Sequence, residues 1–173
     1  MGSRQRTAIF AAVAAACLTM RPPTAGAGTA TSNMTVTATI SNNCTISTPT
    51  LAFGAYDPVT TNASSDLNAS TAFSLKCTTG ASTTIDLGQG LNAAGGSTST
   101  VPLRQMAAGG NKMAYYLYTD GAHTTVWGAG AATRAYTGTG ATDTSVVCYG
   151  RVPSAQNLPA GSYSDTVVAT INF

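Results

Sequence analysis

Charged side chains are scarce in this sequence of 173 residues, and one kind is missing altogether. Only 8% of the residues are charged, and the chain has six aspartates, no glutamate and a single histidine. The N-terminal signal argued below would take Arg4, Arg6 and Arg21 with it, leaving five basic residues against the six aspartates. Such a near-neutral chain lacks the basic surface that nucleic-acid binding needs, although the whole sequence has a pI of 8.4. So little charge also gives little colloidal repulsion, which suits a protein that assembles.

Residue patterns for catalysis or metal binding are also lacking. The single histidine, His123, follows the Asp120-Gly121 turn, and the aspartates are scattered, so neither a nucleophile with its base nor a pair of carboxylates can be built. No two cysteines have C-x-x-C spacing, which disfavours a zinc site that uses His123. The segment 88–90 reads Gly-Gln-Gly, but no helix follows it, so we interpret it as a sharp strand exit and not a dinucleotide loop. We therefore expect no enzyme activity, no cofactor and no metal.

Helical periodicity is the third absence. No segment of helical length carries a 3.6-residue apolar period, and short rows of β-branched and aromatic residues instead alternate with glycine- and proline-containing turns. We expect strands at residues 44–48, 71–78, 83–87, 112–119, 144–152 and 162–173, with a weaker one at 101–106. This spacing is typical of an antiparallel β-sandwich. Once the signal is removed, about 145 residues are left, which fits one domain with a single core.

The N-terminus has the features of a secretory signal peptide. Basic residues at positions 4 and 6 precede an apolar, alanine-rich run at 7–20, and Ala25-Gly26-Ala27 has the small-x-small form of a cleavage site. The run is too short to span a membrane. We predict a signal peptide over residues 1–27, with cleavage after Ala27 or after Ala30. A lipoprotein site at Cys17 is disfavoured because the preceding alanines lack the usual leucine, and a buried N-terminal helix is disfavoured because the basic start and the small-residue exit occur together.

Export changes the meaning of the cysteines. Cys44, Cys77 and Cys148 remain in the mature chain, and in an oxidising compartment they can form disulfides. A bond between the first two would close a loop of about thirty residues and constrain the unfolded chain by roughly 3 to 4 kcal/mol in the entropy model. The third cysteine is then left without a partner.

The last stretch of the chain, residues 161–173, alternates as a half-buried strand does. Its apolar row consists of Tyr163, Val167, Ala169, Ile171 and Phe173. This row needs a partner layer, and the strand needs neighbours on its edges. Because the sequence ends at Phe173, we expect a missing neighbour to come from upstream or from another molecule. A candidate lies near the N-terminus, where polar residues alternate with Met34, Val36, Ala38 and Ile40.

Aromatic residues cluster at positions 115–118, with Trp127 nearby. A strand would send Tyr116 and Tyr118 to one face and Tyr115 to the other. Together with Trp127 they could form a sugar-stacking platform, but at least one face of the strand should belong to the core, which we favour.

Five motifs in order carry a resemblance to a known family. They are Phe53-Gly54-x-Tyr56-x-Pro58, Leu87-Gly88-x-Gly90-x-Asn92, Tyr116-Leu117-Tyr118-x-Asp120 with Trp127-Gly128, Tyr149-Gly150-Arg151-Val152-Pro153, and Leu158-Pro159-x-Gly161-x-Tyr163-x-Asp165-x-Val167. Each motif alone is weak, but together they cover essentially the whole mature chain. In this respect the sequence resembles the spore coat protein U domain family, which includes pilin subunits of archaic chaperone-usher pili.

The resemblance implies an immunoglobulin-like sandwich that lacks its final strand and is completed by a donor strand in trans. In such subunits a periplasmic chaperone fills the groove first, and the N-terminal extension of the next subunit replaces it at an outer-membrane usher. Residues 28–40 match that extension and residues 41–173 the pilin domain. The resemblance also implies a Cys44–Cys77 disulfide and an exported, cell-surface pilus that supports attachment and biofilm. Cys148 departs from the pattern, so it is a buried free thiol, an alternative disulfide partner or an intersubunit bridge.

Physical chemistry gives this expectation a mechanism. An added strand supplies main-chain hydrogen bonds while alternate side chains enter pockets. Burying the four apolar residues at positions 34–40 would contribute on the order of 5 to 8 kcal/mol before ordering costs. Donor and groove are different surfaces, so the contact is head-to-tail and builds an open filament. Two alternatives are a secreted coat or matrix protein and a monomeric carbohydrate-binding module that uses the aromatic cluster.

Overall fold

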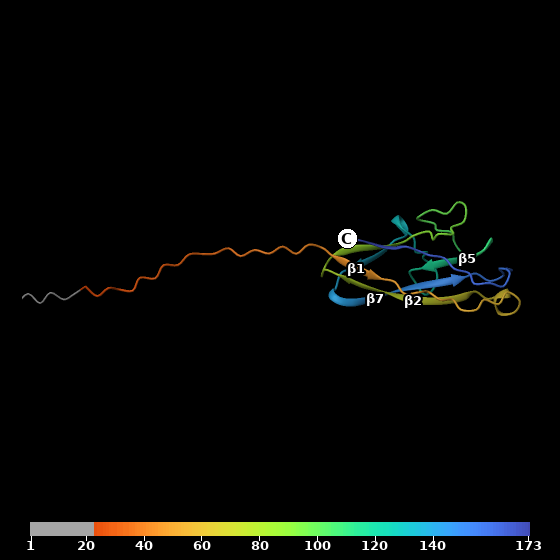
Figure 1. Cartoon of the computed structure of the whole chain (residues 1–173), viewed down its shortest axis with the longest axis horizontal. Coiled ribbons are helices and arrows are strands. Elements are labelled where there is room, and N and C mark those ends of the chain that lie inside the picture. The colour runs from red at the N-terminus through yellow and green to blue at the C-terminus, as the bar shows by residue number, and fades with distance from the viewer. Residues whose placement is uncertain (1–22) are drawn as a thin grey trace, which may run out of the picture. The chain divides into compact units, whose positions relative to one another are not determined.

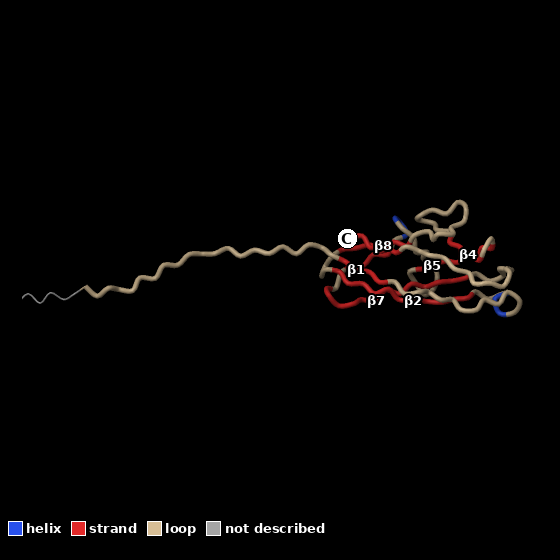
Figure 2. The backbone as a smooth tube through the Cα atoms, viewed as in Figure 1, coloured by secondary structure: helices blue, strands red, loops and turns tan. Residues whose placement is uncertain are grey.

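The computed structural model describes residues 23–173, and the chain divides into two units, Met1–Ala38 and Thr39–Phe173. The predicted signal peptide therefore lies mostly outside the described residues, as does Cys17. In the first unit, residues 23–38 have neither helix nor strand and their side chains are exposed (Figure 2). Between residues 23 and 173 there is no helix long and apolar enough to cross a membrane.

The second unit is an antiparallel β-sandwich of two sheets, as the sequence predicts (Figure 1). One sheet has the order β1-β2-β7-β5-β4, and the other has the order β6-β3-β8. The strands are β1 (Cys44–Ser47), β2 (Leu67–Cys77), β3 (Ser82–Leu87), β4 (Arg104–Ala108), β5 (Asn111–Tyr118), β6 (Arg134–Thr137), β7 (Gly140–Val152) and β8 (Ala169–Asn172). Two single-turn 3-10 helices, η1 (Thr61–Ala63) and η2 (Gly130–Ala132), lie in loops.

The core lies between the inward faces of the two sheets. The long pair of β2 and β7 sets its register, with Phe73 opposite Val146 and Thr71 opposite Cys148. Side chains alternate along both strands, so one face packs inward while the other carries polar residues. Trp127 is fully buried, and its Nε1 donates a hydrogen bond to the Ile85 carbonyl 2.8 Å away.

A disulfide joins Cys44 of β1 to Cys77 at the end of β2, the pairing that the family resemblance implies. These two residues are also directly opposite each other in the β1–β2 pair. Cys148 is a free thiol with 1% of its surface exposed. Burial raises the pKa of this thiol to about 11, because a desolvated thiolate is disfavoured.

Several strands differ from the sequence prediction, and β2 begins four residues before the predicted start at 71. Strand β6 lies in the glycine- and alanine-rich stretch after residue 128, where we expected none, and β7 begins four residues before the predicted start at 144. Of the predicted strand 162–173 only the end, β8, is regular, although Ser164 forms an isolated bridge to Ala107 of β4. The segment therefore crosses from the edge of one sheet to the edge of the other, and each part pairs with a different neighbour.

Candidate functional site: an apolar groove between two unpaired segments

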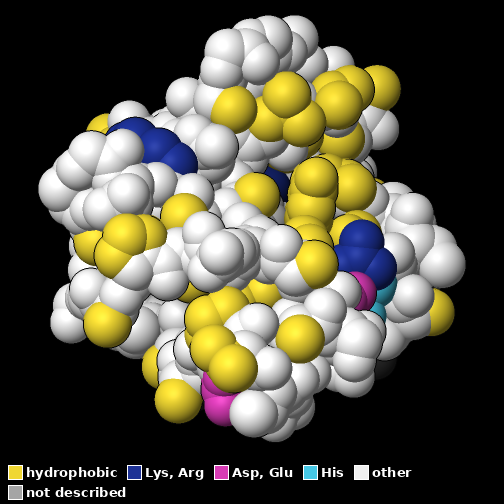
Figure 3. All heavy atoms as spheres, turned by 90° about the vertical axis from the view of Figure 1, so that its right-hand side faces the viewer, with side chains coloured by type: hydrophobic (Ala, Val, Ile, Leu, Met, Phe, Trp, Pro, Cys, Tyr) yellow, Lys and Arg dark blue, Asp and Glu magenta, His cyan; other side chains and the backbone are white. Residues whose placement is uncertain are grey.

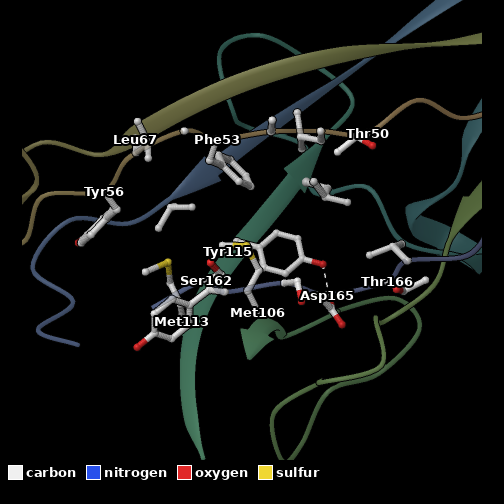
Figure 4. A pocket seen from close by; sticks show the side chains of 18 of the residues that line it. Thr50, Phe53, Tyr56, Leu67, Met106, Met113, Tyr115, Ser162, Asp165 and Thr166 are labelled. Atoms are coloured by element: carbon white, nitrogen blue, oxygen red, sulfur yellow. Dashed lines mark hydrogen bonds between the residues drawn. The ribbon is translucent and has the colours of Figure 1, made fainter. Parts of the chain in front are cut away.

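The sandwich contains a groove of about 980 Å³. Its two walls are residues 48–56, which follow β1, and residues 158–167, which precede β8. Its floor is made by inward-facing side chains of five strands: Leu67, Thr71, Phe73, Leu87, Met106, Met113, Tyr115, Leu117, Cys148 and Val152. Figure 4 shows Phe53 of one wall and Tyr115 of the floor pointing into the space between the walls.

The backbones of both walls lack partners on the groove side. Residues 48–56 make no backbone–backbone hydrogen bond within the part of the chain that the structure describes. In the other wall, Ser164, Thr166 and Val168 bond to neighbours away from the groove, whereas no such bond is made there by Tyr163, Asp165 or Val167. Alternate residues of a strand point their N–H and C=O groups to opposite sides, so this pattern is that of an edge strand. The groove therefore presents the two edges that a missing strand would join.

The two walls run in opposite directions. Every neighbouring pair in the order β1-β2-β7-β5-β4 is antiparallel, so β1 and β4 run in the same direction. Ser164 of the second wall bridges antiparallel to β4 and therefore runs opposite to β1. Ser47, at the end of β1, lies level with Ser145 of β7, and a Cβ on Gly150 of β7 would come within 2.6 Å of Leu51 and 2.7 Å of Phe53. The first wall therefore packs over β7 and keeps the direction of β1. A strand laid into the groove would be parallel to one wall and antiparallel to the other.

Asp165 fixes the second wall to the sandwich. Its Oδ1 accepts hydrogen bonds from the backbone N–H of Leu91 and of Asn92 at 3.0 and 3.2 Å, and from the Asn92 side-chain amide at 3.1 Å. Its Oδ2 accepts the Tyr115 hydroxyl at 2.7 Å, the bond drawn in Figure 4. Burial and this bond hold the pKa of Tyr115 well above its usual value. The carboxylate thus finds its hydrogen-bond partners within the protein itself.

Arg104 supports the same region from below. It is 1% exposed, and its guanidinium donates to the carbonyls of Leu87, Gly88 and Trp127 at 2.8 to 3.0 Å. Burial lowers the pKa of this guanidinium to about 10, because desolvation disfavours the cation more than Tyr115 and Asp165 favour it. It remains charged at neutral pH and ties the end of β3 to the Trp127 loop.

A second polar network closes one end of the groove. The Gln156 side chain accepts from the Ala114 N–H at 2.7 Å and donates to the Ala114 carbonyl at 3.0 Å, as a neighbouring strand would. The Tyr56 hydroxyl accepts from the Gln156 N–H at 2.9 Å and donates to the Pro153 carbonyl at 3.0 Å. These bonds anchor the end of the first wall.

The apolar row of residues 163–173, for which the sequence predicts the role of acceptor, lines the groove only in part. Tyr163, Val167 and Ala169 line it, and all three are half-buried against the core. Ile171 packs against the core beyond the groove, opposite Ile85, and Phe173 is 54% exposed. The predicted donor residues are all exposed. Met34 (84% exposed), Val36 (78%) and Ala38 lie in the first unit, and Ile40 (86%) lies at the start of the second.

Sequence reasoning missed the first wall and much of the floor. Leu51 and Phe53 alternate with exposed neighbours, so a short two-residue period was present but was too brief to predict a strand. Met106 and Met113 face each other across β4 and β5, and only the sheet order brings them to the groove.

The aromatic cluster belongs largely to the core, as favoured from the sequence, and does not form the alternative sugar-stacking platform. Trp127 and Tyr118 are buried, and Arg151 lies over the rings of Tyr116 and Tyr118 at 5.8 and 5.1 Å from their centroids. His123 packs edge-on to Tyr118, with ring centroids 5.0 Å apart. These faces are occupied by the protein's own side chains, which leaves little ring surface for a sugar.

In the part of the chain that the structure describes, charged groups do not gather into a second site. The end of the sandwich seen in Figure 3 carries hydrophobic side chains in several places and few charged ones between them. Among residues 23–173 no group of three or more His, Cys, Asp or Glu side chains is arranged to hold a metal ion.

Comparisons with known proteins bear on the fold and the family of this chain. A solved chaperone–tip adhesion subunit pre-assembly complex from the archaic chaperone-usher Csu pili of Acinetobacter baumannii matches with a TM-score of 0.57 at 19% identity. That match covers 78% of this chain and 40% of the solved chain, so this chain spans well under half of that protein's length. Protein U of Myxococcus xanthus is 44% identical over 177 residues, which cover 97% of this chain and 98% of the relative. The model for the Spore Coat Protein U domain matches residues 30–170, and the chain therefore belongs to the Spore Coat Protein U domain family.

Proposed function

We propose that this protein is a non-enzymatic structural subunit of an extracellular, pilus-like filament. In this proposal residues 28–40 of one copy enter the groove of the next, and residues 41–173 form the acceptor domain. The observation that carries the proposal is the pair of facing walls whose backbone groups lack partners on the groove side. Unpaired edges beside an apolar floor are what strand addition requires, because the added strand supplies both hydrogen bonds and side chains.

The composition of the N-terminal segment supports it as the occupant. The apolar residues at positions 34, 36 and 40 are among the most exposed large hydrophobic side chains described, and they alternate with polar residues. Their period matches the two-residue repeat of a strand that places every second side chain on the floor. The floor of the groove is mainly apolar, and the one carboxylate among the lining residues, Asp165, already has hydrogen-bond partners, so an uncharged apolar row fits it.

The route to the cell surface follows from the same chemistry. An open groove exposes apolar surface and free strand edges, so a subunit needs a cap before it assembles. The structural neighbour is a chaperone–subunit complex. We infer that a periplasmic chaperone caps this groove and that an outer-membrane usher exchanges it for the next copy, giving a pilus that supports surface attachment and biofilm.

A matched pair of variants tests the proposal. In the full-length chain Val36→Asp places a charge in the apolar groove, at a cost of several kcal/mol, so filaments seen by electron microscopy should disappear. Thr37→Asp puts the same charge on the opposite side of the donor strand and should leave filaments intact. Deleting residues 28–40 should behave as Val36→Asp does. Filaments that persist in the shortened chain would contradict the proposal.

A second candidate is a secreted coat protein. It is favoured by the near full-length match to Protein U and by the name of the family domain. A coat can use the same strand addition, so the candidates differ in their product. Imaging of the native cell surface would show separate thin fibres for a pilus and a continuous layer for a coat.

A further inference from the structure

The chain between the donor segment and the sandwich is short and is held by one side chain. Donor residues end at Ile40 and β1 begins at Cys44, so only three residues, 41–43, join them. The four Cα-to-Cα steps from Ile40 to Cys44 span at most about 14 Å. If Ile40 is seated in a second copy, which rests on the proposed function, the two sandwiches must lie close together.

Thr78 binds this connection at several points. Its hydroxyl oxygen accepts a hydrogen bond from the Asn43 N–H at 3.0 Å and lies 3.3 Å from the Ser41 carbonyl, to which it can donate. The Thr78 N–H donates to the Asn43 carbonyl at 2.9 Å. The neighbouring residue, Cys77, carries the disulfide to Cys44. The N–H and the carbonyl of Asn43 are therefore both bonded to Thr78, and Cys44 is bonded to Cys77 at the end of β2.

The opposite side of Thr78 is packed as well. A Cβ on Gly138 would lie 2.2 Å from the Thr78 carbonyl oxygen and 2.9 Å from the Cys77 Cβ, so the loop before β7 rests directly on this turn. The Gly80 N–H donates to the Gly138 carbonyl at 2.8 Å, and the Gly138 N–H donates to Ala81 at 2.8 Å. Apart from the Thr78–Asn43 backbone bond, the turn that carries the Thr78 hydroxyl is thus held by backbone bonds that do not involve residues 41–43.

We propose that Thr78 is a positioning residue that fixes the exit of the N-terminal segment, and through it the orientation of each copy relative to the next along the filament. We call the bonds between the Thr78 hydroxyl and residues 41–43 the clamp. The occupant of the groove determines whether copies join, and the clamp determines the angle at which they join. Loss of the hydroxyl leaves the disulfide and the backbone bond in place, so it should loosen the joint without preventing assembly.

Three variants of the full-length chain separate this role from general stability. Thr78→Val removes the hydroxyl and keeps the shape, Thr78→Ser keeps the hydroxyl, and Thr45→Val makes the same change at an exposed neighbouring position whose hydroxyl has no hydrogen bond among the described residues. Amide hydrogen exchange of Asn43, whose N–H bonds to the Thr78 hydroxyl, should be about tenfold faster in Thr78→Val when read by mass spectrometry, as expected for the loss of one hydrogen bond. The other two variants should exchange as the wild type does.

Electron micrographs of the same samples give the second measurement. Filaments of Thr78→Val should bend more, with a shorter persistence length, whereas Thr78→Ser and Thr45→Val filaments should match the wild type. Unchanged exchange in Thr78→Val, or faster exchange with unchanged bending, would overturn the inference. Absence of filaments from the wild-type chain would contradict the proposed function instead, and the exchange comparison would still decide whether the clamp exists.

Discussion

Individual polar residues hold the groove open in a sandwich that is otherwise apolar inside. Asp165 accepts hydrogen bonds from two loop residues and from Tyr115. Arg104 donates hydrogen bonds to three backbone carbonyls nearby. Buried polar groups of this kind are stable only when their bonds are satisfied together. A substitution that displaces one of these groups should therefore lower the free energy of unfolding by a large amount, even when it adds only one methyl group.

Gly90 gives the first test at this scale. A Cβ there would lie 2.1 Å from Asp165 Oδ2, and the residue has φ +83°. Gly90→Ala must both strain the backbone and move a carboxylate that holds four hydrogen bonds, so we expect a loss of about 2 to 4 kcal/mol in the free energy of unfolding. Gly80→Ala is the control, since Gly80 has φ +78° with open space around it, and should cost about 1 kcal/mol. Chemical denaturation of both variants measures the difference, and equal losses would show that Asp165 moves freely.

Cys148 gives the second test, through pH. The pKa of its thiol is raised from 9.0 to about 11 in the folded protein. The unfolded thiol therefore loses its proton first, and the stability that the neutral thiol contributes is full below pH 9 and is lost as pH rises toward 11. Between pH 8 and pH 10 the wild type should lose about 1.3 kcal/mol more than Cys148→Ala. Comparing how the free energy of unfolding changes with pH in the two proteins removes the cost of the substitution itself. Equal pH dependence in both would contradict a raised pKa for the Cys148 thiol.

At the scale of elements, much of the sandwich could be predicted from the sequence. Strands with clear alternation, such as β2, β3, β5 and β7, were located within a few residues of their bounds. Strand β6 was missed because its short segment lies among glycines and alanines that give no periodic signal. The groove could be predicted only in part, because its first wall has no regular strand and its floor depends on the order of strands in space.

The alternation of β8 gives an element-scale prediction. Ile171 packs against the core opposite Ile85, whereas Val168 is 63% exposed. Ile171→Asp should bury an unpaired charge and lower the free energy of unfolding by about 3 kcal/mol or more. Val168→Asp makes the same chemical change on the outer face and should cost less than about 1 kcal/mol. Similar losses in thermal unfolding would place the strand one residue out of register.

At the scale of the whole molecule, the proposed assembly depends on two features, an acceptor groove and a donor segment, that lie in different parts of the sequence. The acceptor groove is formed by residues 48–169, and the proposed donor is residues 28–40. In the proposed assembly the donor and the groove are different surfaces, so the contact is head-to-tail and would extend as a filament if its rotation does not close a ring. The clamp at Thr78 would then act on the geometry of those filaments and not on their existence.

The most direct measurement of this account is amide hydrogen exchange of residues 41–173 with and without a synthetic peptide of residues 28–40. If the peptide adds a strand, exchange should slow at both walls, at residues 48–56 and at Tyr163, Asp165 and Val167, whose backbone groups it would pair. A peptide with Val36→Asp should give no protection, because its charge cannot enter the apolar floor. Protection of neither wall by the native peptide, or equal protection by both peptides, would contradict the claim that this groove receives the N-terminal segment.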